Sequence, residues 1–206
     1  FDFPCPKPAH LHYVGPLRDD RSSHSIAFPF DRLTGQPLIY ASLGSVQNTK
    51  KDVFQTIAAA CKELDVQLVI THGGGMDAAA AKSLPGSPLV VAYAPQREVI
   101  ARASLTITHA GLNTVMDSLS YGVPVVAIPI TFEQPGNAAR VRWTGVGEVV
   151  PVSRLDVSKL RTAIQTVMTK DSYKQNAARI QQAIDQAGGV KRAAEMIEQV
   201  CSATSS

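Results

Sequence analysis

From residue 38 onward, short apolar segments alternate with longer stretches of helical pattern, and no other feature of the sequence constrains the fold as strongly. The apolar segments are nearly continuous, as is typical of parallel strands that helices cover on both faces. Strand–helix–strand units of this kind, joined by right-handed crossovers, build a doubly wound sheet. We therefore predict an α/β fold with a doubly wound, mostly parallel sheet of Rossmann-like type.

The predicted domain occupies residues 38–206, and residues 1–37 are expected to precede it as a linker. Strands are expected at residues 38–43, 67–71, 89–93, 105–108, 125–128 and 148–150. Helices are expected at residues 50–65, 95–102, 112–121, 134–143, 156–169, 172–187 and 189–201. The first 37 residues are rich in proline, which interrupts helices. We expect them to form an irregular interdomain linker that clasps the domain, with a short strand at residues 11–14.

Composition excludes several classes of protein. Hydrophobic residues make up 45% of the chain and charged residues 18%, which argues against a disordered chain. The net charge is only +3, and no long basic run is present, so we expect no nucleic-acid partner. Cys5, Cys61 and Cys201 lack CxxC spacing and predict neither a disulfide framework nor a zinc site. No membrane span or signal peptide is expected, and a start at Phe1 rather than Met indicates either processing or missing sequence upstream.

The strongest candidate site is the segment THAGLNTVMD at residues 108–117, which follows a predicted strand and opens a predicted helix. Unpaired N–H groups and the helix dipole make such a helix N-terminus an anion site. The groups available to an anion belong to His109, Gly111, Leu112, Asn113 and Thr114. Asp117 lies one turn further along and is suited to sugar hydroxyls beside a phosphate. The alternative is an ordinary helix capped by Asn113 or Thr114.

Three further loops follow predicted strands. Tyr93 could stack on a base and Gln96 could bind a ribose or a base edge. Alternatively, Tyr93 is a half-buried tyrosine beside a helix that starts with a proline. Ser45 could donate to a phosphate, or it lies in a routine exit from a strand. Glu133 and Gln134 offer hydroxyl-binding groups, or they mark a helix N-terminus with a favourable acid.

A rival signal lies at residues 72–78, HGGGMDA, which contains G-x-G-x-x-A and so matches a dinucleotide-binding pattern. It follows the second predicted strand rather than the first, and no acidic residue ends the next strand to hold a ribose. We interpret this segment as a flexible loop. The sequence contains neither an HExxH motif nor another cluster with metal-ligand spacing, so no metal site is predicted.

Taken together, residues 93–140 carry a spaced signature: YAPQ at 93–96, THAGLNT at 108–114, YGVP at 121–124 and FEQPGNAAR at 132–140. This signature resembles the donor-binding region of family 1 UDP-glycosyltransferases. Within that family, residues 113–117, 132–140 and AGGVKRAA at 187–194 are most similar to bacterial zeaxanthin glucosyltransferases, with macrolide-type enzymes a near second. The resemblance implies one half of a GT-B fold, namely the carboxy-terminal, donor-binding half.

The resemblance also implies a role for each site residue. Tyr93 would stack on uracil beside the backbone of Ala94 and the side chain of Gln96. The diphosphate would be held by His109, Gly111, Leu112, Asn113 and Thr114, with Ser45 near the β-phosphate. Asp117 would bind the ribose hydroxyls, and Glu133 and Gln134 the hydroxyls of glucose. Tyr93 stands where plant members have tryptophan, and Glu133 stands where aspartate is more usual.

The reaction implied is an inverting transfer of a hexose, with glucose expected, from a UDP-sugar to a hydroxyl of a lipophilic acceptor such as zeaxanthin. No cofactor or metal is expected, since the helix end and His109 would take the charge of the leaving UDP. The catalytic base would belong to an N-terminal acceptor-binding domain upstream of Phe1, so this chain alone is expected to be inactive. The family likeness implies a cytoplasmic enzyme, working at a membrane surface if its acceptor is a carotenoid.

Three alternatives remain from the sequence. The first is a UDP-sugar epimerase on the same fold. The second is a non-catalytic UDP-sugar-binding module that acts with a separate partner. The third is a nicotinamide-dependent dehydrogenase that uses the loop at residues 73–75.

Overall fold

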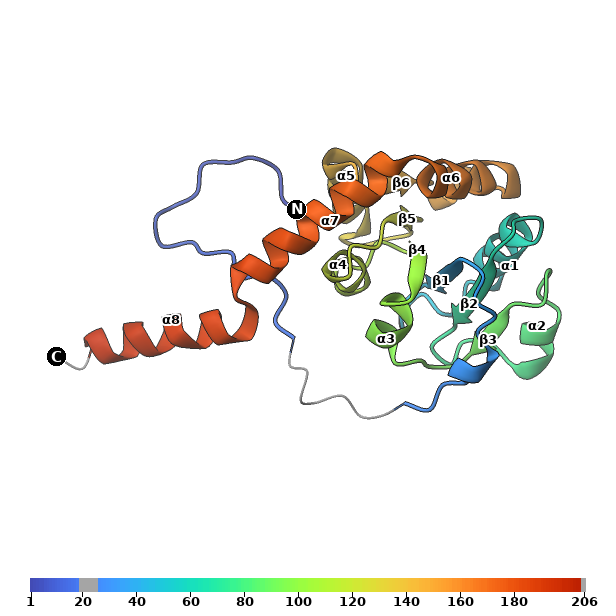
Figure 1. The fold of residues 1–206 in the computed structure, drawn as a ribbon, viewed down its shortest axis with the longest axis horizontal. Helices are drawn as coiled ribbons and strands as arrows, with labels where there is room; N and C mark the ends of the chain where they lie inside the picture. The colour runs from blue at the N-terminus through green and yellow to red at the C-terminus, as the bar shows by residue number, and fades with distance from the viewer. Residues whose placement is uncertain (19–25, 205–206) are drawn as a thin grey trace.

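The computed structural model describes residues 1–18 and 26–204 and contains a six-stranded parallel sheet with strand order β3-β2-β1-β4-β5-β6 (Figure 1). The strands are β1 (Leu38–Ser42), β2 (Gln67–Thr71), β3 (Leu89–Val91), β4 (Ala103–Thr108), β5 (Val125–Ala127) and β6 (Gly147–Val149). All five strand pairs are parallel. The predicted doubly wound, Rossmann-like α/β fold is therefore confirmed.

Helices cover both faces of this sheet (Figure 1). They are α1 (Lys51–Cys61), α2 (Ala78–Lys82), α3 (Gln96–Ile100), α4 (Leu112–Ser120), α5 (Gln134–Thr144), α6 (Val157–Thr169), α7 (Asp171–Ala187) and α8 (Gly189–Thr204), with short 3-10 turns at Phe30–Arg32 and Val152–Arg154. One apolar core joins α1 and α6 to the alternate side chains Ile39 and Ala41 of β1. The opposite face carries Leu38 and Tyr40 against α3. Alternate residues of each buried strand therefore pack into different cores, which explains why the strands read as continuously apolar.

The element boundaries agree with the sequence predictions to within a few residues, apart from three differences. Helix α1 ends at Cys61 rather than residue 65, because the chain turns back there so that Leu64 and Val66 can pack against the core. The short helix α2 was not predicted. The predicted strand at residues 11–14 is wrong: the N–H of Leu11 closes a turn on the carbonyl of Pro8 instead, and this segment pairs with none of the six strands.

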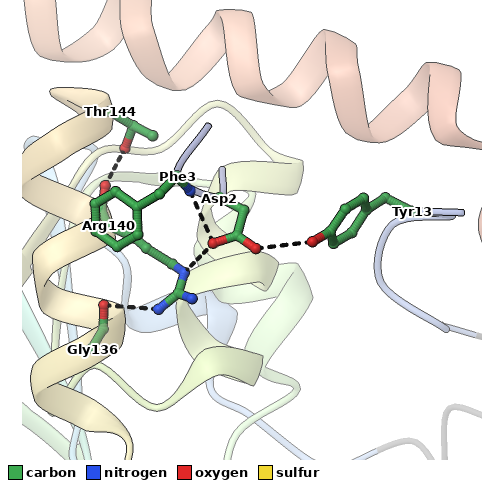
Figure 2. A network of polar contacts seen from close by, with 6 residues as sticks. All are labelled: Asp2, Phe3, Tyr13, Gly136, Arg140 and Thr144. Carbon is green, nitrogen blue, oxygen red and sulfur yellow. Dashed lines mark hydrogen bonds and ion pairs between the residues drawn. The ribbon is translucent and has the colours of Figure 1, made fainter. Parts of the chain in front are cut away.

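The N-terminal segment is fastened to α5 by a polar network around Asp2 (Figure 2). Arg140 Nε donates to Asp2 Oδ1 over 2.8 Å, and the Tyr13 hydroxyl donates to Asp2 Oδ2 over 3.0 Å. The Arg140 hydrogen bond, with smaller contributions from Phe3 N–H and Tyr13, lowers the pKa of Asp2. The start of the chain thus contacts α5, and its role as an interdomain linker stays a prediction. The predicted linker also includes residues 19–25, which lie outside the described residues, and its boundary at residue 37 stays a prediction.

Helix α8 extends away from the rest of the described chain (Figure 1). It carries exposed apolar residues at Val190, Ile197 and Val200. Within the part of the chain that the structure describes, no helix has the length and apolarity needed to cross a membrane.

We expect Gly145→Ala to lower the free energy of unfolding by about 1 kcal/mol, because Gly145 ends α5 with φ +66°, where a Cβ is strained. The added Cβ would also lie 2.7 Å from Asn176 Nδ2, which donates to the Gly145 carbonyl. Urea unfolding measures the change. Gly136→Ala is the matched control in the same helix: its Cβ meets nothing closer than Arg140 Nη1 at 3.5 Å, and we expect no loss of stability. Equal losses in both variants would contradict the argument.

Candidate functional site

Four loops that carry the predicted site residues leave the carboxyl ends of β1, β3, β4 and β5. Because the strands are parallel, these ends share one edge of the sheet. The connections diverge between the neighbouring strands β1 and β4, since β1 leads towards β2 on one side and β4 towards β5 on the other. Ligands of doubly wound sheets bind at such a switch point. The predicted site therefore has the location that the fold favours.

His109 lies at this switch point between two glycine backbones. A Cβ at Gly44, after β1, would lie 2.8 Å from His109 Cε1, and a Cβ at Gly111 would lie 2.5 Å from His109 Nε2. Both positions thus need glycine for the imidazole to fit. Burial lowers the pKa of His109, against smaller raising effects of a hydrogen bond with the Ser42 backbone and of Glu133. The imidazole is therefore neutral at pH 7 and serves as a hydrogen-bonding group.

Ala110 makes the sharp turn between β4 and α4. It is fully buried and has φ +66°, and its carbonyl accepts a hydrogen bond from Asn137 Nδ2 over 3.0 Å. This buried contact from α5 fixes the turn. It stabilises a backbone conformation with positive φ that residues other than glycine rarely adopt.

The N-terminus of α4 has the form expected of an anion site. Its N-cap is Gly111, which has no side chain to accept the first N–H groups. Asn113 and Thr114, the alternative N-caps considered from the sequence, both lie inside the helix. The prediction that one of them caps it is therefore wrong. Leu112 and Asn113 are exposed and Thr114 is buried. The uncapped N–H groups and the positive helix end suit a phosphate.

Asp117 is buried, with its side chain 8% exposed, and both of its carboxylate oxygens are engaged. Gln96 Nε2 donates to Oδ2 over 2.7 Å, and Arg18 Nε donates to Oδ1 over 3.0 Å. Arg18 Nη2 also reaches the Asn113 carbonyl at 3.4 Å. The structure thus joins two predicted residues, Gln96 and Asp117. It adds Arg18, which the sequence analysis missed because no local pattern links residues 99 positions apart.

Tyr93 and Ser45 lie on the exposed side of the same edge. Tyr93 is 59% exposed, and its hydroxyl donates to the Gly73 carbonyl over 3.2 Å. Ser45 is exposed, and its Cα lies beside Gly73. Ala94 follows Tyr93 and is half buried. Tyr93 is held at its hydroxyl end and remains accessible to a ligand.

Glu133 and Gln134 are placed differently, although they are neighbours. Glu133 is exposed, whereas Gln134 is 3% exposed. Gln134 Oε1 accepts from the backbone N–H groups of Ile130 and Thr131, both over 2.9 Å. Gln134 therefore holds the loop between β5 and α5 in shape, and Glu133 is the more accessible of the two to a ligand.

The loop at residues 73–75 is packed rather than open. Asn48 Nδ2 donates to the Gly73 carbonyl over 2.7 Å, and a Cβ at Gly75 would lie 2.1 Å from the Asn48 carbonyl oxygen. Helix α2 is capped by Asp77, whose Oδ1 accepts from Ala80 N–H. A carboxylate thus occupies the helix end that would have to hold the pyrophosphate of a dinucleotide. This arrangement disfavours the dehydrogenase alternative.

A scan against protein-family models matches residues 1–189 to the family described as UDP-glucoronosyl and UDP-glucosyl transferase. The chain belongs to this family. It spans about half the length of the curated relatives it matches and corresponds to their carboxy-terminal half. Among residues 1–18 and 26–204, no group of three or more His, Cys, Asp or Glu side chains could hold a metal ion.

Relatives and solved structures agree with the family. The chain is 37% identical to the zeaxanthin glucosyltransferase of Pantoea ananas over 97% of this chain and 47% of that protein. It is 31% identical to the demethyllactenocin mycarosyltransferase of Streptomyces fradiae over 91% of this chain and 40% of that protein. The calicheamicin glycosyltransferase CalG4 superposes with a TM-score of 0.81 at 26% identity, covering 95% of this chain and 49% of that structure. The chain is thus one Rossmann-like half of a GT-B glycosyltransferase fold.

Proposed function

We propose that this family member binds a UDP-sugar at the edge formed by the carboxyl ends of β1, β3, β4 and β5. The observation that carries the proposal is the junction of β1 with β4. There a half-buried imidazole, an uncapped helix N-terminus and a buried carboxylate lie within one stretch of chain, residues 109–117. Residues 38–206 form the donor-binding domain in this proposal, and residues 1–37 form the linker.

Each site residue has one task in the proposed complex. Tyr93 stacks on uracil beside the Ala94 backbone, and Gln96 and Asp117 bind the ribose hydroxyls, with the Asp117 carboxylate as acceptor. His109 and the turn from Gly111 to Thr114, which includes Leu112 and Asn113, hold the diphosphate, with Ser45 at the β-phosphate. Glu133 binds hydroxyls of the sugar, and Gln134 shapes the loop from which Glu133 projects.

Departure of UDP creates negative charge on the diphosphate. Hydrogen-bond donors that are already in place at that position lower the barrier without a reorganisation cost. In this chain the donors are the first N–H groups of α4 and the His109 imidazole. No step of this proposal requires a metal ion or another cofactor.

We further propose that the whole enzyme transfers glucose to a hydroxyl of a lipophilic acceptor. Its support is the similarity to proteins named zeaxanthin glucosyltransferase at 37% identity. Because the chain covers about half of those relatives, an acceptor-binding half is proposed to supply the catalytic base. In this proposal the 206-residue chain alone binds the donor and transfers nothing.

Isothermal titration calorimetry of the chain tests the proposal. We expect UDP and UDP-glucose to bind with dissociation constants below 1 mM, and NAD and NADP not to bind. Absence of UDP binding at millimolar concentration contradicts the proposal. Incubation with UDP-N-acetylglucosamine without acceptor addresses the epimerase alternative, and formation of an epimer would favour it. Addition of a separately produced acceptor-binding half from a relative tests transfer.

A further inference from the structure

A chain of polar side chains runs from the sheet to Asp117, and its innermost members lie in the core. Tyr40, in the middle of β1, is 1% exposed. Its hydroxyl lies 2.8 Å from Thr71 Oγ1 at the end of β2 and donates to Gln96 Oε1 over 3.2 Å. Gln96 Nε2 in turn donates to Asp117 Oδ2 over 2.7 Å.

The chemistry of the groups fixes the direction of these hydrogen bonds. A carboxylate only accepts, so the amide nitrogen of Gln96 must face Asp117 and the amide oxygen must face Tyr40. Tyr40 has a single proton, which it donates to Gln96, so its oxygen is the acceptor in the contact with Thr71, whose hydroxyl also lies 3.5 Å from the Ala41 carbonyl. Burial is the main cause that raises the pKa of Tyr40, so its hydroxyl keeps its proton at neutral pH.

The Gln96 side chain is therefore held at both ends of its amide. Without the Tyr40 hydroxyl, the amide could pivot about its contact with Asp117, and the site would have to order it when a ligand binds. The apolar residues that share a core with Tyr40, which include Val99 and Ile100 of α3, cannot supply this function, because their side chains have no hydrogen-bonding group.

We propose that Tyr40 is a positioning residue for ribose recognition: its hydroxyl fixes the Gln96 amide, and through it the Asp117 carboxylate, in the orientation that ribose hydroxyls require. The proposal rests on the proposed function for Gln96 and Asp117. Tyr40 itself touches no ligand. Its effect is consequently specific to nucleotides that carry ribose hydroxyls.

Tyr40→Phe tests the proposal, since it removes the hydroxyl and keeps the ring. In calorimetry on the 206-residue chain, we expect the dissociation constant for UDP to rise about three- to tenfold. The constant for 2′,3′-dideoxy-UDP should stay within about 1.5-fold of the wild-type value. Equal weakening towards both ligands would mean a general packing defect and would overturn the proposal.

Two variants serve as matched controls. Thr71→Val removes a buried hydroxyl from the same chain but leaves the Tyr40–Gln96 contact, and UDP affinity should stay within about twofold of wild type. Thr106→Val removes a buried hydroxyl that pairs with Ser118 Oγ over 2.8 Å away from this chain, with the same expectation. If either control variant weakens UDP binding as much as Tyr40→Phe does, a specific role for Tyr40 is contradicted.

A double-mutant cycle measures the link directly. In a Gln96→Ala background, Tyr40→Phe should have no further effect on UDP binding, whereas additive losses would overturn the proposal. Melting curves check that each variant folds. If Tyr40→Phe does not fold, hydrogen exchange of the Gln96 side-chain amide protons in the wild-type chain serves as a second measurement. We expect slow exchange, and fast exchange contradicts the proposal.

The outcomes separate the two levels of inference. A wild-type chain that fails to bind UDP overturns the proposed function and this proposal together. A wild-type chain that prefers UDP to 2′,3′-dideoxy-UDP supports the proposed function. If Tyr40→Phe then keeps that preference unchanged, only the positioning role is overturned.

Discussion

In the full-length glycosyltransferase proposed above, replacing His109 with alanine is expected to lower turnover at least tenfold. The imidazole lies between Gly44 and Gly111 beside the N-terminus of α4, where the leaving diphosphate is proposed to sit. Loss of one donor that is already in place typically costs on the order of 10²–10³ in rate. Steady-state kinetics with UDP-glucose measures the effect. Turnover like that of the wild type would contradict the assignment.

The pH dependence of donor binding follows from the same residue. Burial holds the pKa of free His109 below its ordinary value of 6.5, and a bound diphosphate raises it. Binding then takes up a proton, so affinity rises as pH falls through the higher, bound-state pKa and levels off below the lower, free-state pKa. UDP-glucose is the right ligand, because it lacks a terminal phosphate that titrates near pH 6. His109→Ala should remove this dependence, and a dependence that persists contradicts it.

Asp117→Asn is expected to weaken UDP binding to the chain about tenfold or more. Asp117 is proposed to accept ribose hydroxyls, and a hydrogen bond to a charged group is worth about 1.5–3 kcal/mol. The variant keeps the shape of the side chain, so the loss reports the charge. Calorimetry with UDP measures the effect, and an unchanged dissociation constant contradicts the ribose role.

Two control variants distinguish loss of the ribose contact from loss of the Arg18–Asp117 ion pair as the cause of weaker UDP binding. Arg18→Ala breaks the 3.0 Å contact with Asp117 and should not weaken UDP binding, since Arg18 holds an oxygen that the ribose is proposed to use. If Arg18→Ala weakens binding as much as Asp117→Asn, the ion pair rather than the ribose contact explains the loss. Asp156→Asn, at the exposed N-cap of α6, is the matched charge control and should leave UDP affinity unchanged.

Local sequence pattern was sufficient for most of the fold. Continuous apolar segments predicted six parallel strands, since such segments require cover on both faces. The strand that failed, at residues 11–14, was an isolated apolar segment whose partner no local pattern could supply. Helix α2 was missed because its five residues, four of them alanine, follow a glycine-rich loop and give no amphipathic period.

The candidate site, like the fold, was predictable from the sequence only in part. The sequence by itself predicted a helix that opens at residue 112 directly after the strand ending in Thr108, with His109 in the turn between them, because both elements follow from neighbours along the chain. That Gly111 rather than Asn113 or Thr114 is the N-cap was decided by the structure. Only the tertiary structure decided that Gln134 turns inward to hold Ile130 and Thr131 while Glu133 stays exposed. It alone brought Arg18 and Gln96 to the two oxygens of Asp117, and Tyr40 to Gln96. These partners lie 21 to 99 positions apart, and a hydrogen bond between such groups depends on how the strands and helices pack, which no local period encodes.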